Sequence, residues 1–241
     1  MIVSYKNKFI FIKTAKTAGT SMTMYLSHFC GEGDLITNLK KEEVEYAKSH
    51  GYQIPHGFRT HIESYRLYVW KLIKYFQSDQ KDKKTSSRKV RKNLSAYSAN
   101  LYLGQEVWNT YFKFCFERNP FDKAVSLYYW HTRDLKIRPE INEYIQKADR
   151  SKLSNWHLYT IDDQVAVDFV GRYENLDVDV RIIAEKLGLP DHSLPNAKGT
   201  SHTNHQHYSQ ILNAESKSYI ENMCAKEIEM FKYYWVRQEG T

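Results

Sequence analysis

The sequence predicts an α/β protein with three layers, in which helices flank a central parallel β-sheet in a P-loop-like arrangement. Residues 9–12 form an apolar run without polar alternation, which is typical of a strand covered on both faces. Residues 111–116 form a second, aromatic-rich run, and a segment suited to a helix follows each run. The 241 residues are 41% hydrophobic, which is enough for one sizeable core. We therefore expect a single domain over residues 1–241.

The segment after the first strand has the composition of a phosphate-binding turn. Small residues at positions 15, 18 and 19 let backbone N–H groups approach an anion directly. Thr20 and Ser21 stand where a helix over residues 20–29 is expected to begin, beside the positive end of its dipole, and Lys16 reaches the same volume. The motif differs from a Walker A loop because Lys16 precedes Thr20 by four positions. An ordinary strand-to-helix connection with Thr20 as its N-cap is the alternative.

Composition limits the partners and the compartment. A net charge of +7 favours anionic partners, whether a nucleotide, an acidic glycan, nucleic acid or a membrane surface. We find no apolar segment of about 20 residues and no signal-peptide pattern, so we expect a cytoplasmic protein without a membrane span. Cys30, Cys115 and Cys224 lack C-x-x-C spacing, which predicts reduced structural thiols. The histidines at 192, 202, 205 and 207 fit no standard ligand set, so we expect no metal.

The region between the first helix and residue 108 carries weaker signals. Residues 31–57 are typical of a loop, a short helix and a second loop, and residues 62–76 have the period of an amphipathic helix. Residues 81–92 are basic and lie in a segment, about 78–92, that we expect to be flexible. A solvated loop and a clamp for an acidic acceptor are both compatible with this basic run.

A second block of residues points to a second phosphate group. Arg118 follows the strand predicted over residues 111–116, and Ser126 lies on a helix predicted over residues 122–129. In open α/β sheets, ligands bind beyond the carboxyl ends of the strands, so Arg118 is expected to face the same crevice as the loop after residue 12. An arginine fork and a serine hydroxyl are suited to binding phosphate oxygens.

The two blocks resemble the nucleotide motifs of sulfotransferases that use 3′-phosphoadenosine 5′-phosphosulfate (PAPS), in particular the carbohydrate-type, family 2-like enzymes. The run AKTAGTS at 15–21 is similar to the phosphosulfate loop PKTGGTS, with Ala15 in place of proline and Ala18 in place of glycine. The run RNPFDKAVSLYY from Arg118 resembles the 3′-phosphate motif. Residues 159–189 resemble a later strand and helix of the family, which we expect over residues 165–170 and 176–187.

The resemblance implies in-line transfer of a sulfuryl group from PAPS to a hydroxyl or amine acceptor, a carbohydrate or glycoconjugate, with release of 3′-phosphoadenosine 5′-phosphate (PAP) and no metal. Lys16 would neutralise charge on the leaving oxygen, while Arg118 and Ser126 would hold the 3′-phosphate. The polar loop 198–207, which begins at Lys198, would close over the nucleotide before a final helix over residues 214–235. The 5′-phosphate would be held by Lys16, Thr17, Ala18, Gly19, Thr20 and Ser21.

The general base is not evident, because Asn93 stands where relatives have a histidine, and an amide cannot accept the proton. The available substitutes are His56, His61, Glu63 and His131, of which we take His61 as the catalytic candidate because it lies in a loop before the predicted aromatic helix.

Two alternatives remain open. A P-loop-type nucleotide kinase would need a Walker lysine and a Mg²⁺-binding aspartate. A catalytically silent protein that binds nucleotides or nucleic acid would explain Asn93 and the basic run, although we expect no specific nucleic-acid partner.

Overall fold

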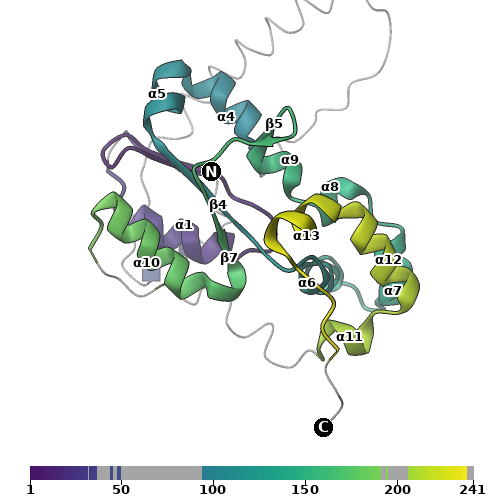
Figure 1. The fold of residues 1–241 in the computed structure, drawn as a ribbon. Helices are drawn as coiled ribbons and strands as arrows, with labels where there is room; N and C mark the ends of the chain where they lie inside the picture. The colour runs from purple at the N-terminus through teal and green to yellow at the C-terminus, as the bar shows by residue number, and fades with distance from the viewer. Residues whose placement is uncertain are drawn as a thin grey trace, which may run out of the picture.

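The computed structural model describes residues 1–31, 33–36, 44–45, 48–49, 94–190, 194 and 206–237. These residues form three layers, with helices on both faces of a five-stranded sheet (Figure 1). The predictions for His61, Asn93, Lys198 and the segments 62–76 and 78–92 lie outside the described residues.

The sheet is mixed, with the strand order β3-β1-β2-β4-β7. Strands β2 (Phe9–Phe11), β4 (Phe112–Glu117) and β7 (Phe169–Arg172) run parallel to one another, as the sequence predicts, and β7 lies at the edge of the sheet. Strand β1 (Ile2–Ser4) runs antiparallel to both of its neighbours, β2 and the edge strand β3 (Leu35–Ile36). The prediction of a parallel sheet missed these two antiparallel pairs. Residues 5–8 link β1 to β2, and so short a link allows only an antiparallel pair, because parallel strands need a longer crossover connection.

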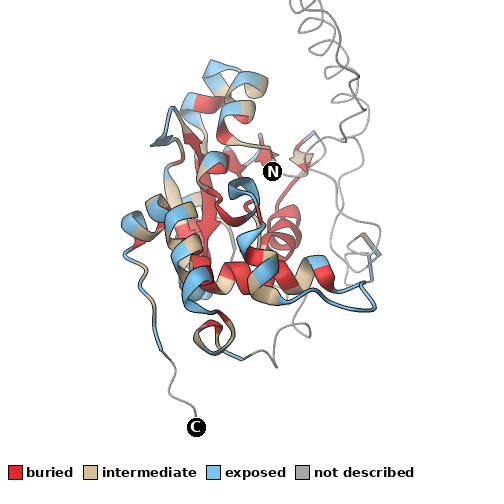
Figure 2. Ribbon diagram, turned by 90° about the vertical axis from the view of Figure 1, so that its right-hand side faces the viewer, coloured by how far each residue is buried: buried red, intermediate tan, exposed pale blue. Residues whose placement is uncertain are grey.

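Both faces of the central strands are buried, which confirms the prediction from residues 9–12 (Figure 2). Phe9, Phe11 and Phe114 pack against helices α1 (Gly19–Ser27) and α10 (Leu176–Leu187). Residues of the opposite face, Ile10, Ile12 and Cys115, pack against helices α4 (Ala96–Leu103), α5 (Gln105–Thr110) and α9 (Trp156–Tyr159).

A third cluster of helices has its own apolar core and lies at the end of β4 where α6 begins (Figure 1). It includes Phe121, Ile145, Tyr208 and Ile220, which are buried together. The helices are α6 (Pro120–Thr132), α7 (Ile141–Gln146), α8 (Arg150–Leu153), α11 (Tyr208–Ile211), α12 (Ala214–Met223) and α13 (Ala225–Phe231). Because α6 belongs to this cluster and follows β4 directly, the cluster borders the predicted nucleotide site.

Several element boundaries differ from the predictions. The strand expected over 165–170 is β7, which begins later, because Val165 pairs in a small hairpin of β5 (Thr160–Ile161) and β6 (Gln164–Val165). The helix expected over 214–235 is divided at Cys224, where the backbone leaves helical geometry. Helix α13 ends at Phe231, and the next residue, Lys232, is in the left-handed region with φ 55°. The helix expected over 122–129 runs from Pro120 to Thr132, whereas α10 has the predicted bounds. A short 3-10 helix, Tyr173–Asn175, precedes α10.

Cys30, Cys115 and Cys224 are free and buried. No helix in the described part of the chain is long and apolar enough to cross a membrane.

Candidate active site

The loop between β2 and α1 has the backbone geometry of an anion-binding turn. Lys16 and Ala18 have positive φ values of 63° and 55°, and Thr17 between them does not. Alternation of this kind turns successive backbone N–H groups toward one side of the chain. The first backbone hydrogen bond of α1 runs from Met22 N to Ala18 O at 3.0 Å, so the amides of the first turn have no acceptor within the helix. These amides and the helix dipole favour an anion at this end of α1.

Two buried threonines fix the loop to the neighbouring strand. Thr14 Oγ1 donates to the carbonyl oxygen of Phe116 at 2.5 Å and lies 2.7 Å from Thr17 Oγ1. The Thr17 side chain is buried and bonded within the loop, so its hydroxyl is directed toward the protein. The predicted contact of Thr17 with a phosphate therefore rests on its backbone amide.

Gly19 leaves room for the Lys13 side chain. A Cβ added at Gly19 would lie 2.8 Å from Lys13 Cγ and 2.9 Å from Lys13 Cε. A larger residue at position 19 would therefore displace the lysine from the start of α1.

Arg118 joins the two predicted phosphate motifs. It lies at the end of β4, and its Nη1 donates to the carbonyl oxygen of Lys16 at 3.2 Å, although the two residues are 102 positions apart. Its guanidinium lies 4.1 Å from the centroid of the Tyr173 ring, and Nε donates to Asp122 at 2.7 Å. Nη2 also contacts Asp122. Three of the five guanidinium N–H groups are thus used among the described residues, and two remain for a ligand.

Ser126 is the polar group of the site that most clearly lacks a partner. Its side chain lies on α6 and is 3% exposed, and its hydroxyl has no hydrogen-bond partner within the described ranges. A buried hydroxyl without a partner costs about 1–3 kcal/mol of stability, so native proteins rarely keep one without a reason. An acceptor such as a phosphate oxygen would remove this cost, and the residues present therefore fit a nucleotide with a second phosphate.

Lys16 extends along α6. Its Nζ lies 4.7 Å from the centroid of the Trp130 ring, and the Arg133 guanidinium lies 3.7 Å from the same ring. Trp130 follows Ser126 by four residues, so both lie on one face of the helix. The sequence prediction missed Trp130 because the predicted helix ended at residue 129. The four-residue spacing from Ser126 is the signal that would have found it.

Among the candidates for the base, only His131 lies in the part of the chain that the structure describes. Its Nδ1 contacts the Tyr144 hydroxyl. Partial burial and the cations Lys152, Lys16 and Arg133 hold the pKa of His131 below its usual value of 6.5. The imidazole is therefore mainly neutral at pH 7, which is the form that accepts a proton.

Charged residues with no contact to solvent lie beneath the loop and Arg118. Glu117 and Glu227 are 0% exposed and Lys123 is 1% exposed. Lys123 Nζ lies 2.8 Å from Glu117 Oε1 and 3.9 Å from Glu227 Oε1. Burial raises the pKa of Glu117, an effect that the Lys123 ammonium opposes. This group, which we call the buried cluster, was not predicted from the sequence.

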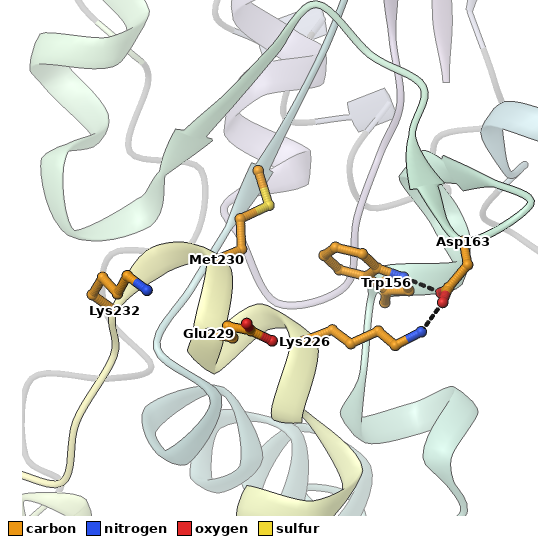
Figure 3. Close-up of a pocket in the computed structure, with 6 residues that line it drawn as sticks. All are labelled: Trp156, Asp163, Lys226, Glu229, Met230 and Lys232. Carbon is orange, nitrogen blue, oxygen red and sulfur yellow. Dashed lines mark hydrogen bonds and ion pairs between the residues drawn. The ribbon is translucent and has the colours of Figure 1, made fainter.

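A separate groove of about 460 Å³ opens beside α9 and α13 (Figure 3). Trp156 Nε1 donates to Asp163 at 2.7 Å, and Lys226 is paired with the same carboxylate. The other lining residues are Glu229, Met230 and Lys232. Among the residues that the sequence assigns to the nucleotide, none of those that the structure describes lines this groove. No group of three or more potential metal ligands occurs in the described ranges.

Comparison with known proteins places the chain in a family. The model of the sulfotransferase family matches residues 1–234. An uncharacterized protein from Archaeoglobus fulgidus is 36% identical over 93 residues, which cover 37% of this chain and 78% of that protein. No solved structure matches. Since the family model covers nearly the whole sequence, the chain belongs to the sulfotransferase family.

Proposed function

We propose that this protein transfers a sulfuryl group from PAPS to a hydroxyl or amine group of a carbohydrate or glycoconjugate. The observation that carries the proposal is the hydrogen bond from Arg118 to the Lys16 carbonyl, which joins two phosphate motifs that are far apart in the sequence. The unpartnered hydroxyl of Ser126 supports a ligand with a 3′-phosphate. Membership of the sulfotransferase family supports the class of reaction.

We assign a role to each residue of the proposed site. When bound, PAPS supplies an activated sulfuryl group. The loop amides and the first turn of α1 would bind the 5′-phosphate, and Arg118 and Ser126 would bind the 3′-phosphate. Lys16 would stabilise negative charge on the leaving oxygen. Transfer of this kind depends on positioning and charge stabilisation more than on covalent catalysis.

Our candidate for the base is still His61, and His131 is the substitute that the structure describes. His131 follows Trp130, whose ring centroid lies 4.7 Å from Lys16 Nζ, and the Lys16 charge is among the causes that lower the pKa of His131. His61→Ala, His131→Gln and Asn93→His should be assayed across pH. If one histidine is the base, removal of that histidine alone eliminates the limb of the rate profile that belongs to its imidazole. If neither histidine is the base and no other group has taken that role, Asn93→His raises the rate, since a general base contributes about 10²–10⁴-fold.

A transfer assay with labelled PAPS tests the function. The acceptor panel should contain acidic and neutral glycans, lipid-linked sugars and small phenols, and we expect labelled product from a carbohydrate. Calorimetry with PAP, ATP–Mg²⁺ and single-stranded DNA separates the alternatives. Tighter binding of ATP–Mg²⁺ than of PAP would favour a kinase. Binding of PAP without transfer to any acceptor, in both the unmutated protein and Asn93→His, would favour a silent binding protein.

A further inference from the structure

Asn155 clamps the backbone of the loop from a distant part of the sequence. It is 1% exposed and lies just before α9, 140 residues from Ala15. Its Oδ1 accepts a hydrogen bond from Ala15 N at 3.0 Å, and its Nδ2 donates to the Ala15 carbonyl oxygen at 3.2 Å. One side-chain amide thus satisfies both backbone groups of Ala15, the residue immediately before Lys16. Two hydrogen bonds in opposite directions fix both the position and the orientation of this residue.

The same amide connects the loop to the second motif through the buried cluster. Asn155 Nδ2 also donates to Glu117 Oε1 at 3.0 Å. Glu117 Oε1 in turn accepts a hydrogen bond from the backbone N–H of Arg118 at 3.0 Å. A single buried carboxylate oxygen is therefore bonded to the clamp of the loop and to the backbone of Arg118. Hydrogen bonds of this kind are stronger in a low-dielectric interior than in water, so the network is stiff.

Helix α13 holds the segment that carries Asn155. Glu227 Oε1 accepts hydrogen bonds from Ser154 Oγ at 2.6 Å, from Asn155 N at 3.0 Å and from Trp156 N at 3.2 Å. Three donors on consecutive residues thus converge on one oxygen, which fixes the backbone from which the Asn155 side chain projects. The backbone of Asn155 is thus anchored by a group that does not belong to the loop.

We propose that Asn155 is a positioning residue that sets the place of Lys16 by clamping Ala15. This inference rests on the proposed function, since it gives Lys16 the role of stabilising the leaving oxygen. Displacement of a catalytic group by about 1 Å costs roughly 10²-fold in rate. Loss of the clamp therefore lowers the transfer rate of a protein that is still folded, and it does so only while Lys16 is present.

A double-mutant cycle between Asn155→Ala and Lys16→Ala tests the proposal. We expect Asn155→Ala to lower kcat by about 10²-fold in the unmutated background and to have no more than a small further effect in Lys16→Ala, because residues that act as a unit are not additive. Equal losses in both backgrounds, or an unchanged kcat in Asn155→Ala, would overturn the proposal. Absence of PAP binding and of transfer in the unmutated protein would instead overturn the proposed function.

Asn142→Ala is the matched control. Asn142 Nδ2 donates to the Ile211 carbonyl at 3.3 Å and to Glu140 Oε1 at 2.9 Å, and its Oδ1 accepts from Asn213 N at 2.9 Å. It thus makes the same kinds of hydrogen bond as Asn155, to a backbone N–H, a backbone carbonyl and a glutamate, but connects α7 to the segment between α11 and α12. We expect Asn142→Ala to have the kcat and PAP affinity of the unmutated protein.

Amide hydrogen exchange in the unmutated full chain provides a test that needs no variant, in case Asn155→Ala does not fold. We expect the Ala15 amide to exchange far more slowly than in an unstructured peptide, both with and without PAP, since its acceptor belongs to the protein. Exchange of this amide at the unstructured rate without PAP would show that the clamp does not form, and would overturn the proposal.

Discussion

The loop after β2 and the helix α6 both carry residues of the proposed nucleotide site, but the loop backbone and the Ser126 hydroxyl are held differently. Residues 14–16 of the loop are bonded to the protein, through Asn155 to Ala15 and through Arg118 to the carbonyl of Lys16. On α6, the Ser126 hydroxyl is buried and has no partner in the described part of the chain. The fold therefore holds the loop without a ligand, whereas under the proposed function a phosphate would supply the partner of the Ser126 hydroxyl.

The largest effect is expected from Lys16→Ala, because the proposed function gives this lysine the role of stabilising charge on the leaving oxygen. Removal of one preorganised group that stabilises developing charge lowers kcat by about 10²–10³-fold. PAP affinity should fall much less, since the interaction is strongest in the transition state. Steady-state kinetics and calorimetry on the same preparation measure both. A variant that retained its kcat and lost only PAP affinity would contradict this role.

Arg118→Ala removes the link between the two regions. We expect PAP binding to weaken by about 1.5–3 kcal/mol, the range for a hydrogen bond to a charged group, with AMP binding changed much less. Calorimetry with both nucleotides measures the difference. Arg181→Ala is the control, because Arg181 is exposed on α10 and donates to the Asp177 carbonyl at 3.3 Å. An equal loss of PAP and AMP affinity would mean that Arg118 only supports the loop and does not bind the 3′-phosphate.

Thr14→Val in the loop and Ser126→Ala on α6 compare the two regions by their effect on the free energy of unfolding of the ligand-free protein. Thr14→Val leaves the Phe116 carbonyl without its donor and should lower the free energy of unfolding by about 1–3 kcal/mol. Ser126→Ala removes a hydroxyl that has no partner among the described residues, so stability should be unchanged or higher, while PAP binding weakens. Denaturant unfolding with and without PAP measures both. Destabilisation of ligand-free Ser126→Ala by more than about 1 kcal/mol would show that the hydroxyl is already bonded.

The smallest effect concerns His131 and pH. Its pKa in the folded protein lies below 6.5, so the unfolded chain binds more protons between the two pKa values. Stability therefore falls as the pH drops from about 6.5 through the folded pKa, and the decline should be smaller in His131→Gln. NMR titration of the imidazole measures the pKa directly. A value above 6.5 would contradict the cationic surroundings described for this residue.

The sequence predicted the elements around the proposed site that local pattern encodes. The loop and Arg118 follow apolar runs directly, and α10 has its predicted bounds because Gly188 ends it in the left-handed region with φ 62°. Asn155 was missed because its partner is 140 residues away and nothing in the residues around it marks the contact. Glu117 and Glu227 were missed for the same reason, since the sequence shows two ordinary acidic residues and only packing buries them.

The site should distinguish PAP from AMP, and this is the most direct test of the account. Both nucleotides carry a 5′-phosphate for the loop, and only PAP carries a 3′-phosphate for Arg118 and Ser126. Calorimetry of the unmutated protein should give a PAP affinity at least about 10-fold above that of AMP, since one hydrogen bond to a charged group contributes about 1.5–3 kcal/mol. Equal affinities for PAP and AMP would contradict the two-phosphate site and the function built on it.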